Sequence, residues 1–182
     1  MSKDTWKYMD DLDYRYKWIS GQSFVKHHMR VAEFNCGNGR LKDYLPDTTV
    51  YLANDLYLQD HLQGVTGYKQ MTDSDFTSHL ITNYYKGDFD ILALLGIGGH
   101  EVTGEPLESS TVTSNLILAV NYFKPSIVII ESVDKFESVR QRIVDETNYA
   151  VRDRLVTSGK GWLENRTLLV LEPKVEVQSK LV

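Results

Sequence analysis

The sequence predicts a three-layer αβα domain whose sheet is mostly parallel and ends in an antiparallel C-terminal hairpin. Three observations support this fold class. Five short apolar segments alternate with segments of helical character along the chain. The later of these apolar segments are apolar throughout, as expected of parallel strands covered on both faces. Two final extended segments follow one another with no helix between them, which is typical of a hairpin.

The strands are predicted from apolar runs that stop at turn residues. We expect them at 30–34, 49–53, 66–71, 90–95, 126–130, 149–156 and 166–171. Polar residues such as Asn54 and Asp55 close the second run, and glycines from Gly96 onward close the fourth. The segment 157–165 separates the last two strands and suits a wide hairpin loop.

The helices are predicted from apolar residues at a spacing of three or four. We expect them at 3–19, 41–45, 57–62, 74–85, 113–123 and 134–147. Trp6, Met9 and Tyr16 share one face of the first helix, and Asp134 is expected to cap the last one. The chain therefore divides into an N-terminal helical cap, 1–29, and one globular domain, 30–182.

Composition narrows the class of protein. A chain of 182 residues with 42% apolar and 25% charged residues suits one folded domain. The net charge of -5 disfavours nonspecific binding to nucleic acid. One cysteine, Cys36, excludes an internal disulfide and a cysteine-built metal cluster, and no other set of metal ligands stands out. We expect a cytoplasmic protein without a membrane-spanning segment or a resident metal.

The most informative motif is the turn that follows the first predicted strand. Asn35, Gly37 and Gly39 occupy alternate positions there, and these residue types tolerate a positive φ. A dinucleotide site would need a further glycine at the position of Arg40 or Lys42, so a nicotinamide or flavin dinucleotide is disfavoured. No Gly-x-x-x-x-Gly-Lys-Ser/Thr phosphate loop occurs.

On these residues the chain resembles the class I S-adenosylmethionine-dependent methyltransferases, a family with a Rossmann-like fold. The resemblance covers about residues 30–173. Glu33 matches the acid near the end of the family's first strand, and Asn35 stands where the family usually has glycine. Asp55, 18 residues after Gly37, matches the second acid, which holds the ribose hydroxyls of the cofactor.

The resemblance implies a binding site for S-adenosylmethionine. A polar residue after the third strand usually meets the adenine amino group, and Asp73 and Asp75 both remain candidates for that position. The residues implied in cofactor binding are Glu33, Asn35, Cys36, Gly37, Gly39, Asp55, Leu56, Asp73, Asp75 and Gly96. His100 and Glu101 follow the fourth strand, where a base facing the methyl acceptor would lie.

The expected function is methyl transfer from S-adenosylmethionine to a small-molecule acceptor, or to a substrate presented by a partner, because little chain remains for a substrate domain. The Asn/Asp-Pro-Pro-Tyr/Phe motif of amino-methylating DNA enzymes is absent after the fourth strand. Three alternatives stay open: a non-catalytic scaffold subunit, an RNA methyltransferase, and an enzyme that transfers another group from the same cofactor. The sequence also leaves a homo-oligomer open.

Overall fold

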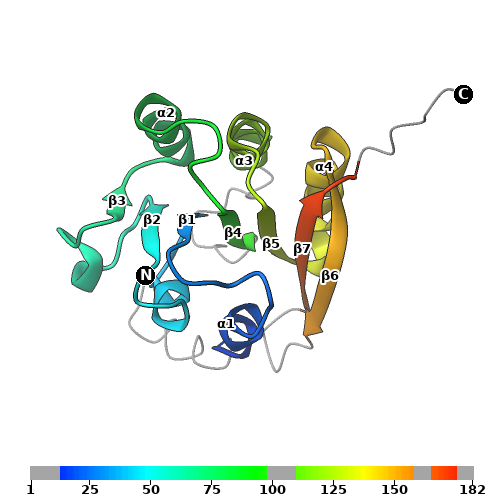
Figure 1. Cartoon of the computed structure of the whole chain (residues 1–182), viewed down its shortest axis with the longest axis horizontal. Helices are drawn as coiled ribbons and strands as arrows, with labels where there is room; N and C mark the ends of the chain where they lie inside the picture. Colours follow the sequence, from blue (N-terminus) through cyan, green and yellow to red (C-terminus); the bar gives the residue numbers. More distant parts are fainter. Residues whose placement is uncertain (1–12, 98–109, 158–164, 176–182) are drawn as a thin grey trace, which may run out of the picture.

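The computed structural model describes residues 13–97, 110–157 and 165–175. Their strands form one seven-stranded sheet (Figure 1). The strand order is β3-β2-β1-β4-β5-β7-β6. The strands are β1 (Arg30–Phe34), β2 (Val50–Asp55), β3 (Tyr68–Gln70), β4 (Ile91–Ile97), β5 (Ile127–Val133), β6 (Tyr149–Thr157) and β7 (Arg166–Pro173). The pairs among β1 to β5 are parallel, whereas β7 runs antiparallel to both β5 and β6. The predicted fold class is confirmed.

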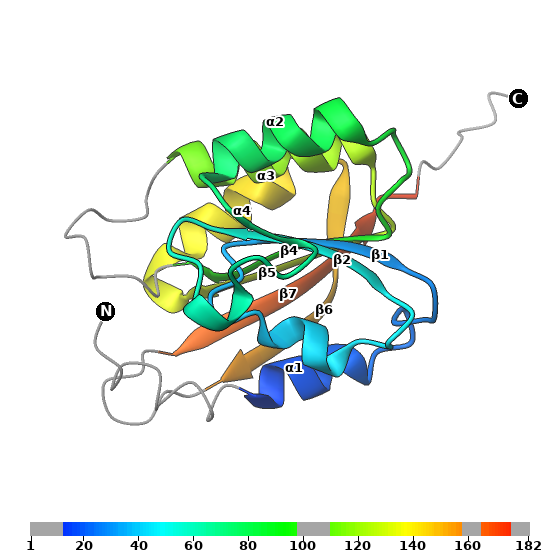
Figure 2. The same ribbon diagram turned by 90° about the vertical axis from the view of Figure 1, so that its left-hand side faces the viewer.

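Helices cover both faces of this sheet, but unequally. Figure 2 shows α2, α3 and α4 side by side on one face and α1 on the other. The α-helices are α1 (Asp13–Ser20), α2 (Asp73–Asn83), α3 (Ser110–Phe123) and α4 (Glu137–Glu146). The short 3₁₀ helices are η2 (Arg40–Tyr44), η3 (Asp60–Leu62) and η5 (Asp134–Phe136). In the described part of the chain, no helix has the length and apolar character needed to cross a membrane.

The structure specifies three helix predictions more closely. The helices expected at 41–45 and 57–62 are 3₁₀ helices, η2 with five residues and η3 with three. The segment 134–147 starts as η5 and becomes helical only at Glu137. Asp134 is therefore not the helix cap, and its Oδ1 instead accepts a hydrogen bond of 2.9 Å from Thr167 Oγ1 on β7. Residues 3–12 of the first predicted helix lie outside the described residues.

The core consists of two apolar layers, one on each face of the sheet. Alternation along β1 sends Ala32 and Phe34 toward α2 and α3, while Val31 packs on the α1 side. The Phe34 and Phe76 rings meet edge to face, with centroids 5.2 Å apart. By the same alternation, Glu33 points to the α1 side, where Arg15 of α1 is a nearby charge.

The helix α1 packs on the 3₁₀ turn η2, directly after the glycine turn. Asp13 accepts hydrogen bonds from Arg40 and, at 2.8 Å, from the Tyr44 hydroxyl. The rings of Tyr16 and Tyr44 stack with centroids 5.6 Å apart. These contacts attach α1 to the same edge of the sheet at which the parallel strands end.

Candidate functional site

The turn after β1 adopts an unusual backbone at three alternate residues. Asn35, Gly37 and Gly39 have φ values of 54°, 58° and 70°, all in the left-handed region. Gly39 N–H closes the turn on the Cys36 carbonyl at 2.9 Å. A Cβ at Gly39 would lie 2.8 Å from Tyr68 Cε1, so this position needs glycine for space as well as for conformation. Asparagine can take the same backbone at Asn35 because its side chain tolerates positive φ.

Asp55, at the end of β2, holds this turn in place. Its Oδ2 accepts a hydrogen bond from Gly37 N–H at 2.9 Å, and its Oδ1 accepts one from Tyr57 N–H at 2.8 Å. The side chain is nearly buried, with 6% of its surface exposed. An ionised carboxylate has about four acceptor positions, so two remain beyond these backbone contacts. The site thus combines a left-handed turn with a carboxylate that can accept two further hydrogen bonds.

The two candidate aspartates at the start of α2 lie in different surroundings. Asp73 Oδ1 accepts a hydrogen bond of 2.9 Å from Asn54 Nδ2. Burial raises the pKa of Asp73 above its ordinary value, and the side-chain amides of Asn54 and Asn35 oppose that rise. Asp75 is exposed, and its N–H donates a hydrogen bond of 3.1 Å to Oγ1 of Thr72, the residue that caps the helix. The structure brings Asp73, and not Asp75, to the residues of the turn.

Glu33 is a buried acid beneath the same turn. It lies between Ala53 of β2 and Ala93 of β4, with 1% of its surface exposed, and it accepts a hydrogen bond from the Tyr51 hydroxyl. Burial raises the pKa of Glu33 to about 7, although the Tyr51 hydrogen bond and the charge of Arg15 lower it. Glu33 therefore changes its charge near neutral pH.

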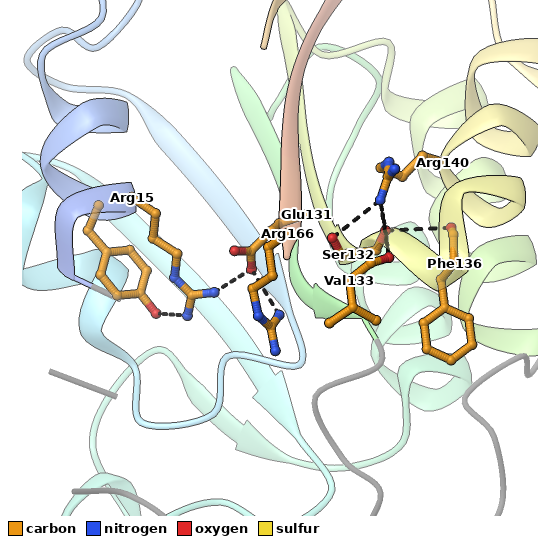
Figure 3. Close-up of polar contacts among 8 residues, drawn as sticks. Arg15, Glu131, Ser132, Val133, Phe136, Arg140 and Arg166 are labelled. Atoms are coloured by element: carbon orange, nitrogen blue, oxygen red, sulfur yellow. Dashed lines mark hydrogen bonds and ion pairs between the residues drawn. The ribbon is translucent and has the colours of Figure 1, made fainter. Parts of the chain in front are cut away.

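A second buried acid, Glu131 on β5, connects α1 to the sheet (Figure 3). Arg15 of α1 pairs with Glu131, and Arg166 Nη1 of β7 lies 3.5 Å from the same carboxylate oxygen. In Figure 3 these two arginines approach Glu131 from one side of β5, whereas Arg140 reaches the neighbouring Ser132 from the other side. Sequence reasoning missed this cluster, although an acid inside an otherwise apolar strand is the same signal that singled out Glu33.

The other predicted site residues have the following positions. Cys36 is buried within the turn, and burial raises the pKa of its thiol. Leu56 follows Asp55 and is exposed. Gly96 lies in β4 where the pairing with β5 shifts register, between Leu94 and Ile97. The two predicted catalytic residues, His100 and Glu101, lie outside the described residues. Among residues 13–97, 110–157 and 165–175, no three His, Cys, Asp or Glu side chains gather as metal ligands would.

A separate cleft of about 600 Å³ lies at the opposite edge of the sheet. Met29, Asp90 and Ser126 line it, and they lie directly before β1, β4 and β5 respectively. Ligands of open parallel sheets bind outside the carboxyl ends of the strands, and this cleft is at the amino ends. It therefore does not belong to the candidate site.

Comparison with known proteins gives structural matches only. No family model matches the chain, and no curated protein sequence matches it. The N-methyltransferase NodS from Bradyrhizobium japonicum, solved with S-adenosyl-L-homocysteine, is similar with a TM-score of 0.64 and 14% identity over 94% of this chain and 93% of that one. Magnesium protoporphyrin IX methyltransferase from Synechocystis, solved with S-adenosylmethionine, has a TM-score of 0.61 and 10% identity, over 96% of this chain and 86% of that one. The ribosomal protein L11 methylase of Lactobacillus delbrueckii has a TM-score of 0.52 and 15% identity, over 87% of this chain and 76% of that one.

These likenesses confirm the fold that the sequence resemblance implied. The chain has the Rossmann-like fold of class I S-adenosylmethionine-dependent methyltransferases, with the strand order 3-2-1-4-5-7-6 and an antiparallel β7. At 10 to 15% identity the comparison concerns the fold and not the acceptor.

Proposed function

We propose that this chain is an S-adenosylmethionine-dependent methyltransferase that acts on a small-molecule acceptor. The hydrogen bond from Gly37 N–H to Asp55 carries this proposal, because it joins the left-handed turn and the second acid into one receptor. The fold adds support, since NodS has it and was solved with S-adenosyl-L-homocysteine.

The polar groups of the turn fit this cofactor. Two neighbouring ribose hydroxyls are donors, and Asp55 has acceptor positions for both. The adenine amino group is a donor, and Asp73 presents a carboxyl at the next strand end. The methionine end carries an ammonium group and the sulfur is cationic, so the nearby acid Glu33 is a favourable neighbour when it is ionised. S-adenosylmethionine supplies a methyl group that is already activated for transfer.

The residues of the chain then bind the cofactor, orient it and exclude water from it. Asp55 fixes the ribose, Asp73 fixes the adenine, and Gly37 and Gly39 let the backbone approach the ligand closely. Correct placement of the reacting groups supplies much of the rate enhancement in such a displacement. His100 and Glu101 remain the proposed bases for an acceptor that must lose a proton.

A small-molecule acceptor is the substrate class that the charge of the chain supports best. With a net charge of -5, the protein repels a polyphosphate backbone on average, which disfavours RNA and DNA. A substrate presented by a partner chain remains the second form of this proposal, because it needs no nucleic-acid groove.

Calorimetry of the full chain with S-adenosylmethionine and with S-adenosylhomocysteine tests the cofactor assignment. We expect both to bind, and Asp55→Ala to weaken both. Asp47→Ala, an exposed acid before β2, is the matched control and leaves binding unchanged. Absence of heat at millimolar ligand would overturn the proposal and favour a scaffold subunit.

Mass spectrometry of the products tests the type of reaction. With a panel of small amines, alcohols and carboxylates as acceptors, methyl transfer yields S-adenosylhomocysteine and an acceptor that is heavier by one methylene unit. Methylthioadenosine would instead indicate aminopropyl transfer and contradict methylation.

A further inference from the structure

The turn after β1 is held from three sides, and one of these contacts comes from outside the sheet. Asp55 of β2 accepts one backbone N–H of the turn at 2.9 Å, and the Tyr68 hydroxyl of β3 donates to the Gly39 carbonyl at 3.2 Å. The third contact is made by the next residue, Arg40, whose guanidinium donates to Asp13 of α1. Glycines lose more conformational freedom than other residues when they are ordered, so a glycine turn depends on such contacts to keep one conformation.

Asp13 is the centre of a small network between α1 and η2. It accepts hydrogen bonds from Arg40 and, at 2.8 Å, from the Tyr44 hydroxyl, and the Tyr44 ring stacks on Tyr16 with centroids 5.6 Å apart. The side chains of Asp13 and Arg40 are 18% and 31% exposed, so solvent screens their attraction only in part. Because η2 starts directly after Gly39, the network fixes the direction in which the chain leaves the turn.

A second contact keeps α1 itself in place. Arg15 of α1 pairs with the buried Glu131 near the end of β5 (Figure 3). Residues two apart on an α-helix point about 200° away from each other, so Asp13 and Arg15 project to nearly opposite sides of α1. The helix thus joins the segment after β1 to β5, and β4 lies between these two strands in the sheet. Fixed at both places, α1 cannot shift without the loss of one of these contacts.

We propose that Asp13 is a positioning residue of the cofactor site, which acts through Arg40 to keep the turn after β1 in the conformation that binds S-adenosylmethionine. This inference rests on the proposed function. Asp13 needs no contact with the cofactor for this role, because a ligand that binds one conformation has an affinity proportional to the fraction of the protein in that conformation. The coupling is reciprocal, so a cofactor that selects the ordered turn also stabilises the attachment of α1.

Calorimetry of the full chain with S-adenosylhomocysteine tests the effect on affinity. We expect Asp13→Ala to raise the Kd about three- to tenfold, as substitutions in a network coupled to a ligand site do. Asp43→Ala, an exposed acid on η2, is the matched control, because it removes the same charge close to the turn; its Kd should equal that of the unaltered chain. Arg40→Met should also raise the Kd, and the double variant should bind no more weakly than Asp13→Ala, because both substitutions remove one contact.

Backbone hydrogen exchange separates positioning from a general loss of stability. In the unaltered chain, S-adenosylhomocysteine should slow exchange in α1 more than in α4, which lies on the other face of the sheet (Figure 2). In Asp13→Ala this excess protection of α1 should disappear, whereas exchange in α4 should follow the global stability alone. The measurement on the unaltered chain needs no substitution, so it tests the coupling even if a variant does not fold.

The possible results separate this inference from the proposed function. If the unaltered chain does not bind S-adenosylhomocysteine, the proposed function fails and the inference fails with it. If it binds, but Asp13→Ala binds equally well or α1 gains no more protection than α4, the inference alone is overturned and the cofactor assignment stands. An equal rise in Kd for Asp43→Ala would also overturn the inference, since the cause would then be the lost charge and not the contact with Arg40.

Discussion

The backbone N–H of Gly37 donates a 2.9 Å hydrogen bond to Oδ2 of Asp55, and this contact joins the ends of β1 and β2. The two strands are parallel neighbours with Glu33 opposite Ala53, so both end at the same edge of the sheet. Asp55 also accepts the N–H of Tyr57 at 2.8 Å. One carboxylate thus fixes the loops after two strands and keeps acceptor capacity for a ligand.

Asp55→Ala should weaken both the cofactor site and the fold. The loss of two charge-assisted ribose contacts should lower the affinity for S-adenosylhomocysteine by roughly 2–4 kcal/mol. The loss of the two backbone contacts should also lower the free energy of unfolding. Calorimetry and urea unfolding measure the two effects separately. Unchanged affinity in a folded variant would show that Asp55 does not hold the ribose.

The sequence predicted the elements that local patterns specify. The first strand, 30–34, matches β1, because an apolar run that ends at a left-handed turn leaves little choice of boundaries. The helices expected at 41–45 and 57–62 are 3₁₀ helices, a type that helical spacing over five or six residues does not distinguish from an α-helix.

The sequence pattern could not predict contacts between residues that are far apart in the chain. Arg15 and Glu131 are 116 positions apart, and only the packing of α1 on the sheet brings them together. The choice between Asp73 and Asp75 needed the direction of each side chain at the start of α2, which depends on the Thr72 cap. Both candidates are aspartates, only two positions apart in the chain, so the sequence left them open.

Gly39→Ala should destabilise the protein more than Gly64→Ala. Both glycines have a left-handed backbone, with φ of 70° and 75°, so alanine costs about 1–2 kcal/mol at either position. At Gly39 the new Cβ would also lie 2.8 Å from Tyr68 Cε1, whereas nothing lies within 4 Å at Gly64. The crowding should add about 1–3 kcal/mol to the loss of stability in urea unfolding. Equal losses would mean that the Tyr68 ring moves aside freely.

Arg15→Met should loosen the attachment of α1 to the sheet. The substitution keeps the length of the side chain but removes a charge that pairs with the buried Glu131. Breaking a buried ion pair costs about 3–5 kcal/mol, and the lower part of that range is expected because Arg166 still faces Glu131 at 3.5 Å. Urea unfolding measures the change, with the exposed Lys17→Met on the same helix as control. A loss no larger than that of the control would contradict the role of Arg15 as an anchor.

Glu33 should make the stability of the protein fall as the pH rises through the acid range. Burial raises its pKa from 4.5 to about 7 in the folded protein. Between these two pH values the folded chain keeps a proton that the unfolded chain has released, so raising the pH favours unfolding. The contribution amounts to about 3 kcal/mol, lost between about pH 4.5 and 7 and constant above that range.

Urea unfolding of the parent chain and of Glu33→Gln at pH 5, 6, 7 and 8 measures this contribution. Glutamine keeps an acceptor for the Tyr51 hydroxyl but cannot ionise, so its stability relative to the parent should increase by about 2.5 kcal/mol from pH 5 to pH 8. The exposed Glu137→Gln controls for the general effect of removing a carboxylate and should follow the parent at every pH. Arg15→Met should move the transition to higher pH, because the positive charge of Arg15 lowers the pKa of Glu33. Parallel pH curves for Glu33→Gln and the parent would mean that Glu33 is already ionised in the folded protein at pH 5, and its place beneath the turn would then be that of a permanent negative charge.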